Sequence, residues 1–339
     1  MATRSYRGIL LGAGNVARTA HLPGFRATPE LRDRIEIVAA VDARPDLPSL
    51  DGVPVLVDRE AALRLGPVDF VDICTPTASH VDLALWAFDR GLHVLCEKPV
   101  AVTDREAALL AERSRAARRV LMPCHQYRWN PAWRKVREWL DAGRIGRWHL
   151  AEFRVYRPHA DPGAGSGPVA WRGLGAESRG GVLLDHGTHL LYLLRDVAGP
   201  PSAVHAWSGR LRHRAYDVED TAQLLLEYPD RLAALFLTWA GRGRETTIRF
   251  LGDRGVIEWV GGDLTLDSDD GTEHLDYREQ LLKSSYPGWF AGLFSDFVVA
   301  MDQGALEAPL ADVAAVASVL EQAYGAGAAA HAEALSRSA

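Results

Sequence analysis

Short apolar runs alternate with helical stretches over the first 124 residues of the chain. After an opening run at Gly8–Leu11, the runs that we interpret as strands are 35–41, 68–74, 93–96 and 120–124, the last of which closes the domain. Helices are expected at about 80–90 and, from the capping-box pair Thr103 and Glu106, to about 118. This alternation is typical of a parallel sheet flanked by helices, so residues 1–124 are predicted to form a doubly wound α/β domain.

The pattern changes at about Trp148, where apolar runs begin to follow one another with few helices between them. Strands are predicted at 148–156, 203–207, 222–228, 232–239, 246–251 and 256–260, and helices at 183–197, 289–301 and 311–330. A glycine- and proline-rich stretch at 160–167 is expected to be a flexible loop and a candidate lid. Residues 125–339 are therefore predicted to form an α+β domain with a large, mostly antiparallel open sheet.

The length of the chain supports this division. Single hydrophobic cores stop growing at roughly 250–300 residues, and the chain has 339 residues, 47% of them hydrophobic. Its 38 Lys and Arg against 44 Asp and Glu give a net charge of −6, which provides no basic surface for nucleic acid or an anionic membrane. A small-molecule partner fits this balance better.

The N-terminal residues contain no long apolar segment, so neither a signal peptide nor a membrane span is expected, and a cytoplasmic location is predicted. Three cysteines, Cys74, Cys96 and Cys124, lie near the ends of predicted strands and show no C-x-x-C spacing. This argues against a disulfide framework and a structural zinc site. The cysteines are expected to be reduced and to act as small buried side chains.

A glycine turn, Gly12-Ala13-Gly14-Asn15-Val16-Ala17, separates the first apolar run from a helix-like stretch. Gly12 allows a tight turn, Gly14 lets the backbone approach a pyrophosphate, and Ala17 is small enough for close helix packing. The helix N-terminus at Asn15 and Val16 then presents free N–H groups to the phosphates. Glycine turns without a nucleotide are common, so the motif gains weight only from its position between a strand and a helix.

Asp42 ends the second apolar run, where a carboxylate accepts hydrogen bonds from both hydroxyls of an adenosine ribose and repels a 2′-phosphate. It therefore favours NAD, although a strand-ending aspartate that merely starts a turn is the simpler alternative. Arg44 leaves NADP open, because a guanidinium there could bind a 2′-phosphate through paired hydrogen bonds.

Glu97-Lys98-Pro99 follows directly on a predicted strand, at the edge where open α/β sheets bind ligands. A lysine beside a nicotinamide could hydrogen-bond a substrate hydroxyl and stabilise the negative charge that develops on its oxygen. An ordinary exposed lysine is the competing interpretation of this tripeptide.

The segment from Gly180-Gly181 to His189 leads into an apolar helix. Asp185 and His189 are four residues apart, so both can project from one helical face. A carboxylate beside an imidazole raises the imidazole pKa and fixes its orientation, which suits a proton acceptor near neutral pH. Helix capping by Asp185 with a surface His189 explains the spacing equally well. His186 and His189 could hold a metal, but no third ligand is evident and no metal site is predicted.

These segments together resemble the glucose-fructose oxidoreductase, inositol dehydrogenase and MocA family of nicotinamide-dependent sugar and polyol oxidoreductases, over nearly the whole chain. The blocks that carry the resemblance are Gly12–Ala17 with His21-Leu22-Pro23, Ile73-Cys74-Thr75-Pro76 with His80, Glu97-Lys98-Pro99, and Gly180-Gly181 with Asp185 and His189. The resemblance implies a Rossmann domain that binds NAD, or NADP, and a catalytic set of Lys98, Asp185 and His189.

The resemblance also implies roles for further residues. Thr75, Pro76 and His80 would lie along the cofactor, and Glu97 would contact the nicotinamide ribose. The second sheet would build a homodimer or homotetramer interface.

At the rim of the substrate pocket, the resemblance implies Arg128 and Asn130 from the crossover between domains, and Trp171 and Arg172 from the loop before the double glycine. His186 stands where relatives often carry a small or apolar residue, so it is added to the substrate-binding set. Whether His186 or His125 shares the proton transfer is left open.

The predicted reaction is reversible hydride transfer between the nicotinamide and a secondary alcohol of a sugar, inositol or related polyol. His189, oriented by Asp185, would take the hydroxyl proton, and Lys98 would stabilise the oxygen. Two alternatives are NAD-dependent glycoside hydrolysis with transient oxidation and a non-catalytic nucleotide-binding regulator. The sequence does not identify the sugar or polyol, the physiological direction, or a dimer rather than a tetramer.

Overall fold

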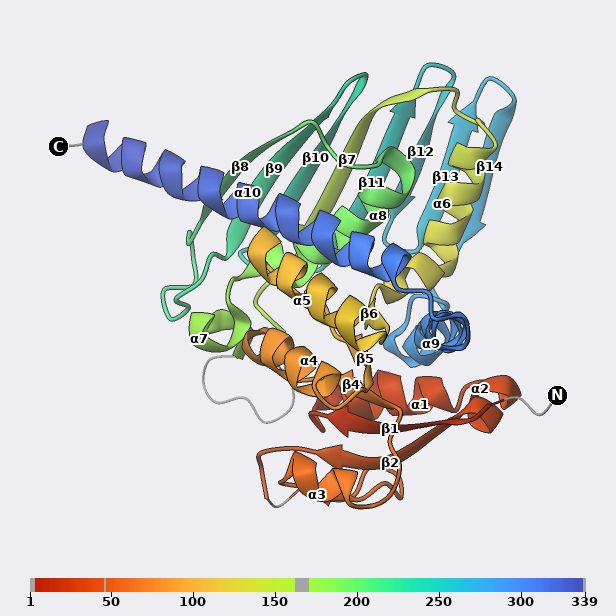
Figure 1. Cartoon of the computed structure of the whole chain (residues 1–339). Helices are drawn as coiled ribbons and strands as arrows, with labels where there is room; N and C mark the ends of the chain where they lie inside the picture. The colour runs from red at the N-terminus through yellow and green to blue at the C-terminus, as the bar shows by residue number, and fades with distance from the viewer. Residues whose placement is uncertain (1–3, 46, 162–170, 338–339) are drawn as a thin grey trace. The chain divides into compact units, whose positions relative to one another are not determined.

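The computed structural model describes residues 4–45, 47–161 and 171–337, which form two compact units (Figure 1). Among these residues the first unit runs to Trp129 and takes up Lys283–Ala314 again, and the second runs from Asn130 to Leu282 and from Ala315 onward. Most of the predicted lid, residues 162–167, lies outside the described residues. No helix within the described ranges is both long and apolar enough to cross a membrane.

The first unit is built on a six-stranded parallel sheet in the order β3-β2-β1-β4-β5-β6. Its strands are β1 (Tyr6–Leu11), β2 (Ile35–Val41), β3 (Val55–Leu56), β4 (Phe70–Ile73), β5 (His93–Cys96) and β6 (Leu121–Pro123). Its helical segments are η1 (Ala17–His21), α1 (Leu22–Phe25), α2 (Pro29–Arg34), α3 (Arg59–Leu63), η2 (Thr77–Ser79), α4 (His80–Phe88), α5 (Asp104–Ala117), η3 (Gln126–Trp129), η6 (Lys283–Ser285) and α9 (Tyr286–Gln303).

This sheet confirms the predicted doubly wound architecture. The chain moves outward from β1 to β3 and then crosses back to β4, so the carboxyl ends of β1 and β4 flank the point where the direction of winding reverses. Ligands of open α/β sheets bind at such a point. The two-residue edge strand β3 carried no apolar run long enough to be identified from sequence.

An aromatic layer from α9 completes the core of the first unit. The Phe25 and Phe294 rings stack with centroids 3.9 Å apart, and Phe297 meets Phe70 edge-on at 5.5 Å. All four side chains are buried. From the sequence, this helix was assigned to the domain at 125–339, whereas the structure groups it with the first unit. A return of the chain to an earlier core leaves no signal in the local sequence, so this placement was not predicted. The predicted division at 124 and 125 stays a prediction.

The second unit contains an eight-stranded sheet in the order β14-β13-β12-β11-β7-β10-β9-β8, in which only β7 and β10 are parallel neighbours. The strands are β7 (Trp148–Tyr156), β8 (Ala203–Gly209), β9 (Thr221–Tyr228), β10 (Arg231–Thr238), β11 (Glu245–Gly252), β12 (Gly255–Val260), β13 (Asp263–Ser268) and β14 (Gly271–Asp276). The mostly antiparallel sheet is confirmed. Strands β13 and β14 were not predicted, because they are short and rich in polar residues.

The helical segments of the second unit are α6 (Pro131–Asp141), η4 (Trp171–Gly173), α7 (Gly175–Ser178), η5 (Leu183–Gly187) and α8 (Thr188–Ala198), with α10 (Glu307–Arg337) contributing from Ala315 onward. Helices α6, α8 and α10 lie on one face of the sheet (Figure 1). Burial alternates along the strands accordingly, with every second residue of β9 buried from Ala222 to Tyr228. The alternate residues, such as Leu225 and Leu232, are exposed on the opposite face.

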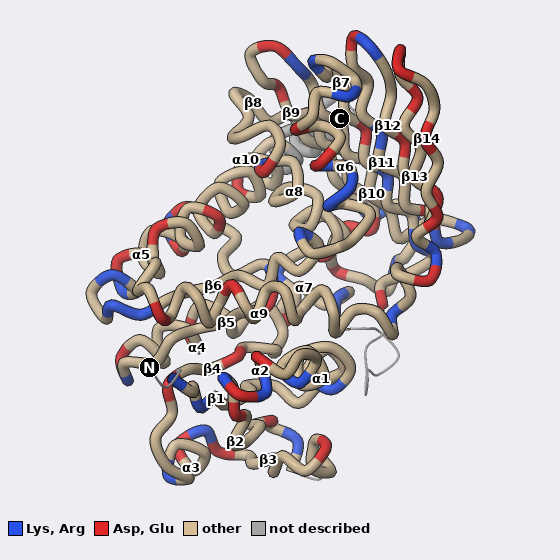
Figure 2. Tube along the Cα trace, turned by 90° about the vertical axis from the view of Figure 1, so that its right-hand side faces the viewer, with Lys and Arg blue, Asp and Glu red and all other residues tan. Residues whose placement is uncertain are grey.

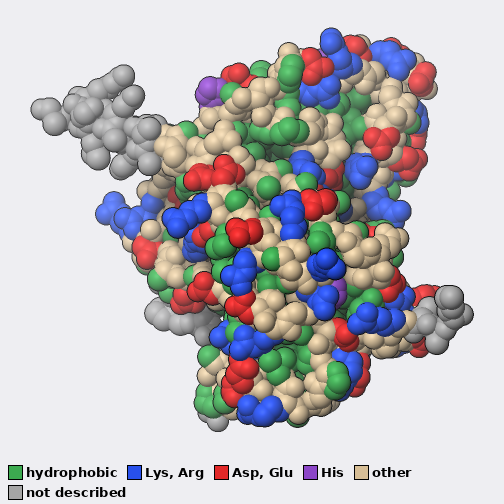
Figure 3. All heavy atoms as spheres, in the orientation of Figure 1, with side chains coloured by type: hydrophobic (Ala, Val, Ile, Leu, Met, Phe, Trp, Pro, Cys, Tyr) green, Lys and Arg blue, Asp and Glu red, His purple; other side chains and the backbone are tan. Residues whose placement is uncertain are grey.

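Acidic and basic residues are interspersed along both units. Figure 2 shows Lys and Arg next to Asp and Glu on the strands and turns of β11 to β14, and Figure 3 shows the same mixture on the face in view. Many of these charges are paired locally, as in the exposed pairs of Arg249 with Glu258 and Arg231 with Asp230. Exposed pairs of this kind contribute little to stability. Their main effect is to balance positive and negative charge on the surface.

Candidate functional site

The glycine turn after β1 has the geometry of a dinucleotide site. Gly12 has a φ of +98°, and a Cβ there would lie 2.7 Å from the carbonyl oxygen of Cys74. Gly14, in contrast, has no atom within 4 Å of the position its Cβ would take, so open space lies beside this part of the turn. Helical structure begins at Asn15 and Val16. Free backbone N–H groups beside open space are what a pyrophosphate requires, and the turn therefore fits NAD.

Asp42 follows β2 and is held next to this turn. Its Oδ2 accepts a hydrogen bond of 2.9 Å from the N–H of Ala13, and both its oxygens accept hydrogen bonds of 2.9 Å from the Arg44 guanidinium. Burial alone would raise the Asp42 pKa, but the hydrogen bonds from Arg44 and Ala13 outweigh it and lower the pKa to about 2. The sequence foresaw both residues but not that they form a bidentate pair.

The loop after β4 lies on the other side of the glycine turn. The N–H of Cys74 donates to Leu11 O at 2.7 Å, and the Ser79 hydroxyl donates to Thr75 Oγ1 at 2.7 Å. The His80 ring lies 2.8 Å from Pro99 O and 2.9 Å from Thr75 O, through its two nitrogens. His80 therefore ties the Thr75-Pro76 turn to the turn that carries Lys98, a positioning role that its sequence spacing alone did not reveal.

Glu97 and Lys98 follow β5 at the same edge of the sheet. The backbone N–H of Lys98 donates to Glu97 Oε2 at 3.1 Å, so the acidic side chain folds back on its own turn. Glu97 is buried, Lys98 is half-buried, and the Lys98–Pro99 peptide is cis. The first unit thus gathers the predicted cofactor residues on the loops and helix starts that follow the carboxyl ends of β1, β2, β4 and β5.

A buried cluster beneath these loops was not foreseen. His21, at the end of η1, places Nδ1 2.7 Å from Asp72 Oδ2 and Nε2 2.9 Å from Glu97 Oε1. Cys124 brings its sulfur within 4.8 Å of the nearest His21 and Asp72 atoms. Both ring nitrogens of His21 are at hydrogen-bonding distance from carboxylates, so we describe the group as a hydrogen-bonded network. The three cysteines are buried, as the sequence analysis expected of packing residues.

The predicted catalytic segment of the second unit begins with a π-helical turn, η5. The N–H of Thr188 donates to Leu183 O, one residue further back than in an α-helix. Asp185, in this turn, lies 3.3 Å from Arg172 Nε and 3.7 Å from His186 Nε2. His189 follows in α8, and its Nδ1 lies 2.9 Å from the Tyr192 hydroxyl. Tyr192 is a partner of His189 that sequence reasoning missed.

Glu219 explains the double glycine before this turn. Its carboxylate accepts hydrogen bonds from the N–H groups of Gly181, at 2.9 Å, and Leu183, at 3.1 Å, and from the Tyr324 hydroxyl at 2.9 Å. A Cβ on Gly180 would collide with the Tyr324 hydroxyl, and one on Gly181 with Glu219 O. Glycine is therefore required at 181, where the close atoms are backbone, whereas at 180 the close atoms belong to the side chains of Tyr324 and Leu184. Burial raises the Glu219 pKa, while these hydrogen bonds oppose the rise.

The remaining predicted residues have structural partners. Arg128 pairs with Asp312 inside the first unit. Asn130 is buried and caps α6, its Oδ1 accepting hydrogen bonds from the next two free N–H groups of the helix. The Arg172 guanidinium lies 4.4 Å from the centroid of the Trp171 ring. Their contact with a substrate stays a prediction, as does action of Lys98 with Asp185 and His189 on one carbon.

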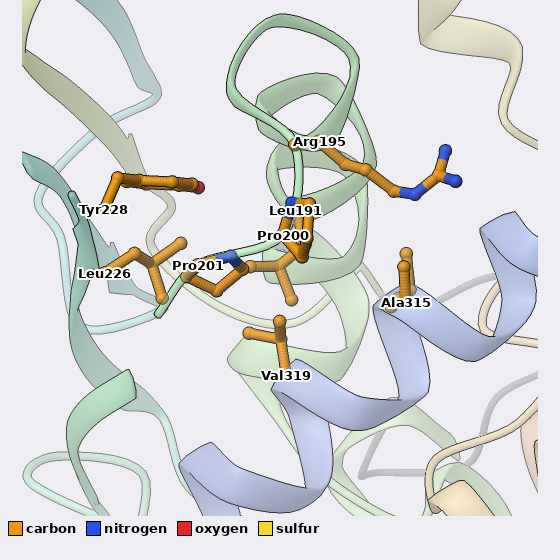
Figure 4. Close-up of a pocket in the computed structure, with 10 residues that line it drawn as sticks. Leu191, Arg195, Pro200, Pro201, Leu226, Tyr228, Ala315 and Val319 are labelled. Carbon is orange, nitrogen blue, oxygen red and sulfur yellow. The ribbon is translucent and has the colours of Figure 1, made fainter. Parts of the chain in front are cut away.

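A small cavity in the second unit lies between α8, β9 and α10. It is lined by apolar side chains that include Leu191, Leu226 and Val319, while the Arg195 side chain extends away from them (Figure 4). The cavity measures about 20 Å³, the space of about one water molecule. It is a packing gap and does not have the volume of a ligand site.

Two family profiles match this chain. The profile of the oxidoreductase family's NAD-binding Rossmann fold matches residues 7–125, and that of the GFO/IDH/MocA C-terminal domain matches residues 133–258. The chain belongs to the Gfo/Idh/MocA oxidoreductase family. Its first unit is accordingly the NAD-binding domain of that family.

Individual members are distant from this Gfo/Idh/MocA protein in sequence. Levoglucosan dehydrogenase of Pseudarthrobacter phenanthrenivorans is 32% identical over 142 residues, 41% of this chain and 35% of the relative. D-glucoside 3-dehydrogenase of Escherichia coli is 28% identical over 207 residues, 60% of this chain and 56% of the relative. The aligned segments thus span about a third to just over half of these relatives. A solved structure of levoglucosan dehydrogenase with NADH has a TM-score of 0.82 at 23% identity, covering 96% of this chain and 97% of that one.

Proposed function

We propose that this Gfo/Idh/MocA protein is an NAD-dependent dehydrogenase that oxidises a secondary alcohol of a sugar, cyclitol or related polyol. The observation that carries the proposal is the placing of Lys98 next to Glu97 at the carboxyl end of β5, on the same sheet edge as the glycine turn. That edge is where an NAD-binding sheet holds its ligand. Relatives with similar sequences are dehydrogenases whose names specify sugars: levoglucosan, D-glucosides and D-apiose.

Each protein group has a defined task in this proposal. The Lys98 ammonium donates a hydrogen bond to the substrate oxygen and stabilises the charge that develops there. His189 removes the hydroxyl proton through Nε2, because an Nδ1–H that donates to the Tyr192 hydroxyl leaves the second nitrogen as the ring's acceptor. NAD, when bound, accepts the hydride. Asp185, paired with Arg172, keeps a negative charge beside the His186 imidazole and adds polar contacts for hydroxyl groups.

The proposal includes a preference for NAD over NADP. Asp42 is ionised over the whole physiological range, with a pKa of about 2. Its carboxylate would repel a 2′-phosphate, and Arg44 is already held by both of its oxygens. Binding NADP would require Arg44 to leave that bidentate pair, so the same contact that stabilises Asp42 disfavours the phosphorylated cofactor.

We further propose that the chain forms a homodimer or homotetramer through the helix-free face of the eight-stranded sheet. Supporting this, Trp207, Leu225 and Leu232 are exposed on β8, β9 and β10, and Phe236 lies at an alternate position of β10. Large apolar side chains exposed on one face of a sheet are common at interfaces. Light scattering of the wild type and of a Leu225→Arg variant tests the point, since the variant should shift to a smaller species.

The experiment that tests the function is a screen of sugars, inositols and amino sugars with NAD and with NADP, following the absorbance of the reduced nicotinamide. The proposal expects reduction of NAD by at least one polyol class and a weaker response with NADP. Aryl glycosides with a catalytic amount of NAD are assayed in parallel. Release of aglycone without net NADH, or NAD binding with no turnover of any compound, would contradict the proposal.

A further inference from the structure

The His21 network is fully enclosed in the first unit. His21 and Asp72 are 0% exposed and Glu97 is 8% exposed. Two aromatic rings of α9 cover the imidazole, with Phe290 at 4.5 Å and Phe294 at 5.5 Å between ring centroids. Solvent is therefore excluded from His21 and Asp72 and reaches Glu97 only slightly, so these polar groups must find most of their hydrogen bonds within the network.

The geometry of the network requires one proton more than a neutral imidazole supplies. Nδ1 lies 2.7 Å from Asp72 and Nε2 lies 2.9 Å from Glu97, so each contact needs a hydrogen between nitrogen and oxygen. A neutral imidazole has a single N–H and an ionised carboxylate has none. In one of the two contacts, a lone pair on a ring nitrogen would then face a negatively charged carboxylate oxygen, which is unfavourable inside a protein.

The other titratable groups around the ring do not supply a third negative charge. Cys74 Sγ lies 3.3 Å from Nδ1, and burial raises the pKa of this thiol to about 12. Burial also raises the pKa of Cys124. Both thiols stay protonated at neutral pH, so Asp72 and Glu97 are the charges that face the ring.

We propose that His21 is a positioning residue, a buried imidazolium that bridges Asp72 and Glu97 and thereby fixes the Glu97–Lys98 turn at the ligand edge of the sheet. One Glu97 oxygen is held by His21 and the other accepts the Lys98 backbone N–H. The bridge thus runs from the protein interior to the residue before the proposed catalytic lysine. This proposal adds a positioning residue to the proposed function, and its kinetic tests rest on that function.

Electrostatics agree with this geometry. Burial by itself lowers the pKa of an imidazole, but the charge of Asp72 and its hydrogen bond raise the His21 pKa well above its ordinary value. Burial would raise the Glu97 pKa, yet the hydrogen bond from His21 brings it below its ordinary value. Burial also raises the Asp72 pKa, and the charge and hydrogen bond of His21 oppose that rise. The proposal places the extra proton on His21 and leaves Glu97 ionised.

The direct test is nitrogen NMR of the histidine rings in the full-length protein, with the His21 signal assigned by its loss in His21→Gln. The proposal expects two protonated ring nitrogens on His21 at neutral and mildly alkaline pH. A neutral His21 ring at pH 7 would overturn it, whether the proton sits on Asp72 or is absent. Stoichiometric zinc in the purified protein would overturn it too. These readouts need no substrate, so they stand even where the proposed function fails.

A kinetic test uses Asp72→Asn with Asp69→Asn as its matched control, since Asp69 is a more exposed aspartate just before β4. Loss of one anionic partner lets burial lower the His21 pKa, so the ring should lose its extra proton at a lower pH than in the wild type. Turnover of Asp72→Asn should then fall about tenfold or more as pH rises, by loss of a charged hydrogen bond to Glu97, while the wild type and Asp69→Asn change in parallel. An Asp72→Asn profile that follows the wild type would overturn the proposal.

Discussion

Each of the two units contains a π-helical turn, and the side chains that the two turns carry differ in exposure. In the first, the π-helical turn η1 ends at His21, whose side chain is fully buried against two carboxylates. In the second, the π-helical turn η5 carries Asp185 and His186, whose side chains stay 14% and 22% exposed. π-turns concentrate at functional sites. The first turn thus encloses its polar side chain in the interior, and the second leaves its polar side chains partly open to solvent.

The two units differ in how far along the sequence the residues that hold each proposed site lie from it. The cofactor loops of the first unit follow parallel strands, so their place at one sheet edge is set by the strand order. The η5 turn depends instead on Glu219 and Tyr324, which are far from it in sequence. We therefore expect substitutions in the first unit to affect cofactor and chemistry separately, and substitutions around η5 to affect folding and chemistry together.

The largest expected effect is on the chemistry of the second unit. His189→Ala should lower turnover by about 10²–10⁴, the usual contribution of a positioned proton acceptor, with NAD affinity nearly unchanged. Steady-state kinetics and NAD titration measure both quantities. His149→Ala, at an exposed position of β7, is the control. Full activity of His189→Ala would show that His189 is not the proton acceptor and would contradict the role proposed for the second unit.

Next in size is the cofactor contact of the first unit. Asp42→Ala should weaken NAD binding by roughly 10–100-fold, the loss of charge-assisted hydrogen bonds to a ribose. NADP binding should weaken less or improve, because Arg44 is released from Asp42. Fluorescence titration with both cofactors measures the change, with the exposed Asp33→Ala as control. Unchanged NAD affinity would mean that Asp42 only anchors the turn through Ala13.

Gly181→Ala tests the remote support of η5. A methyl group there would collide with the backbone of Glu219, so the free energy of unfolding should fall by about 3 kcal/mol, and turnover should fall with it. Gly243→Ala is the matched control, because it has open space and no left-handed backbone. Denaturant unfolding measures the difference. Equal stability of the two variants would show that η5 does not depend on close approach to Glu219.

The smallest expected effect is a pH dependence in the first unit. Burial lowers the His93 pKa to about 4, and its Nδ1 accepts a hydrogen bond from the Val120 N–H at 3.0 Å. The unfolded chain binds a proton near pH 6.5 and the folded chain does not. The contribution of His93 is thus present above pH 6.5 and lost as pH falls toward 4, with about 2 kcal/mol lost by pH 5.

Unfolding of His93→Gln at several pH values measures this dependence. The difference from the wild type should shrink on acidification, whereas His149→Gln should keep a constant difference. A pH-independent gap between His93→Gln and the wild type would contradict the assignment of a neutral buried ring.

Regular patterns made most of the fold predictable. The parallel sheet followed from apolar runs separated by helices, and six strands of the second sheet followed from runs such as 222–228. Helix α6 was missed, although Asn130 and Pro131 mark a helix start and Gly143 follows its end, because Tyr127–Pro131 was interpreted only as a crossover between the domains. Helix α9 was found, but its place in the first unit depends on aromatic contacts distant in sequence.

The site was predictable where the motif itself fixes the geometry. Gly12, Asp42 and Lys98 all lie at the expected sheet edge. The Asp185–His189 spacing assumed a regular α-helix, and the structure has a π-turn at Asp185, with Arg172 and Tyr192 as partners. The His21 network was not predicted, since its three polar residues lie on three separate segments and Glu97 had been singled out only for contact with the nicotinamide ribose.

The account's central claim is that Lys98 stabilises the reacting oxygen beside the bound cofactor. The most direct test is the single-turnover rate of nicotinamide reduction in Lys98→Ala, with NAD affinity determined on the same sample and Lys135→Ala, on α6, as control. The account predicts a rate lower by about 10²–10⁴ with NAD affinity unchanged within about twofold. A Lys98→Ala enzyme that reduces NAD at the wild-type rate would contradict it.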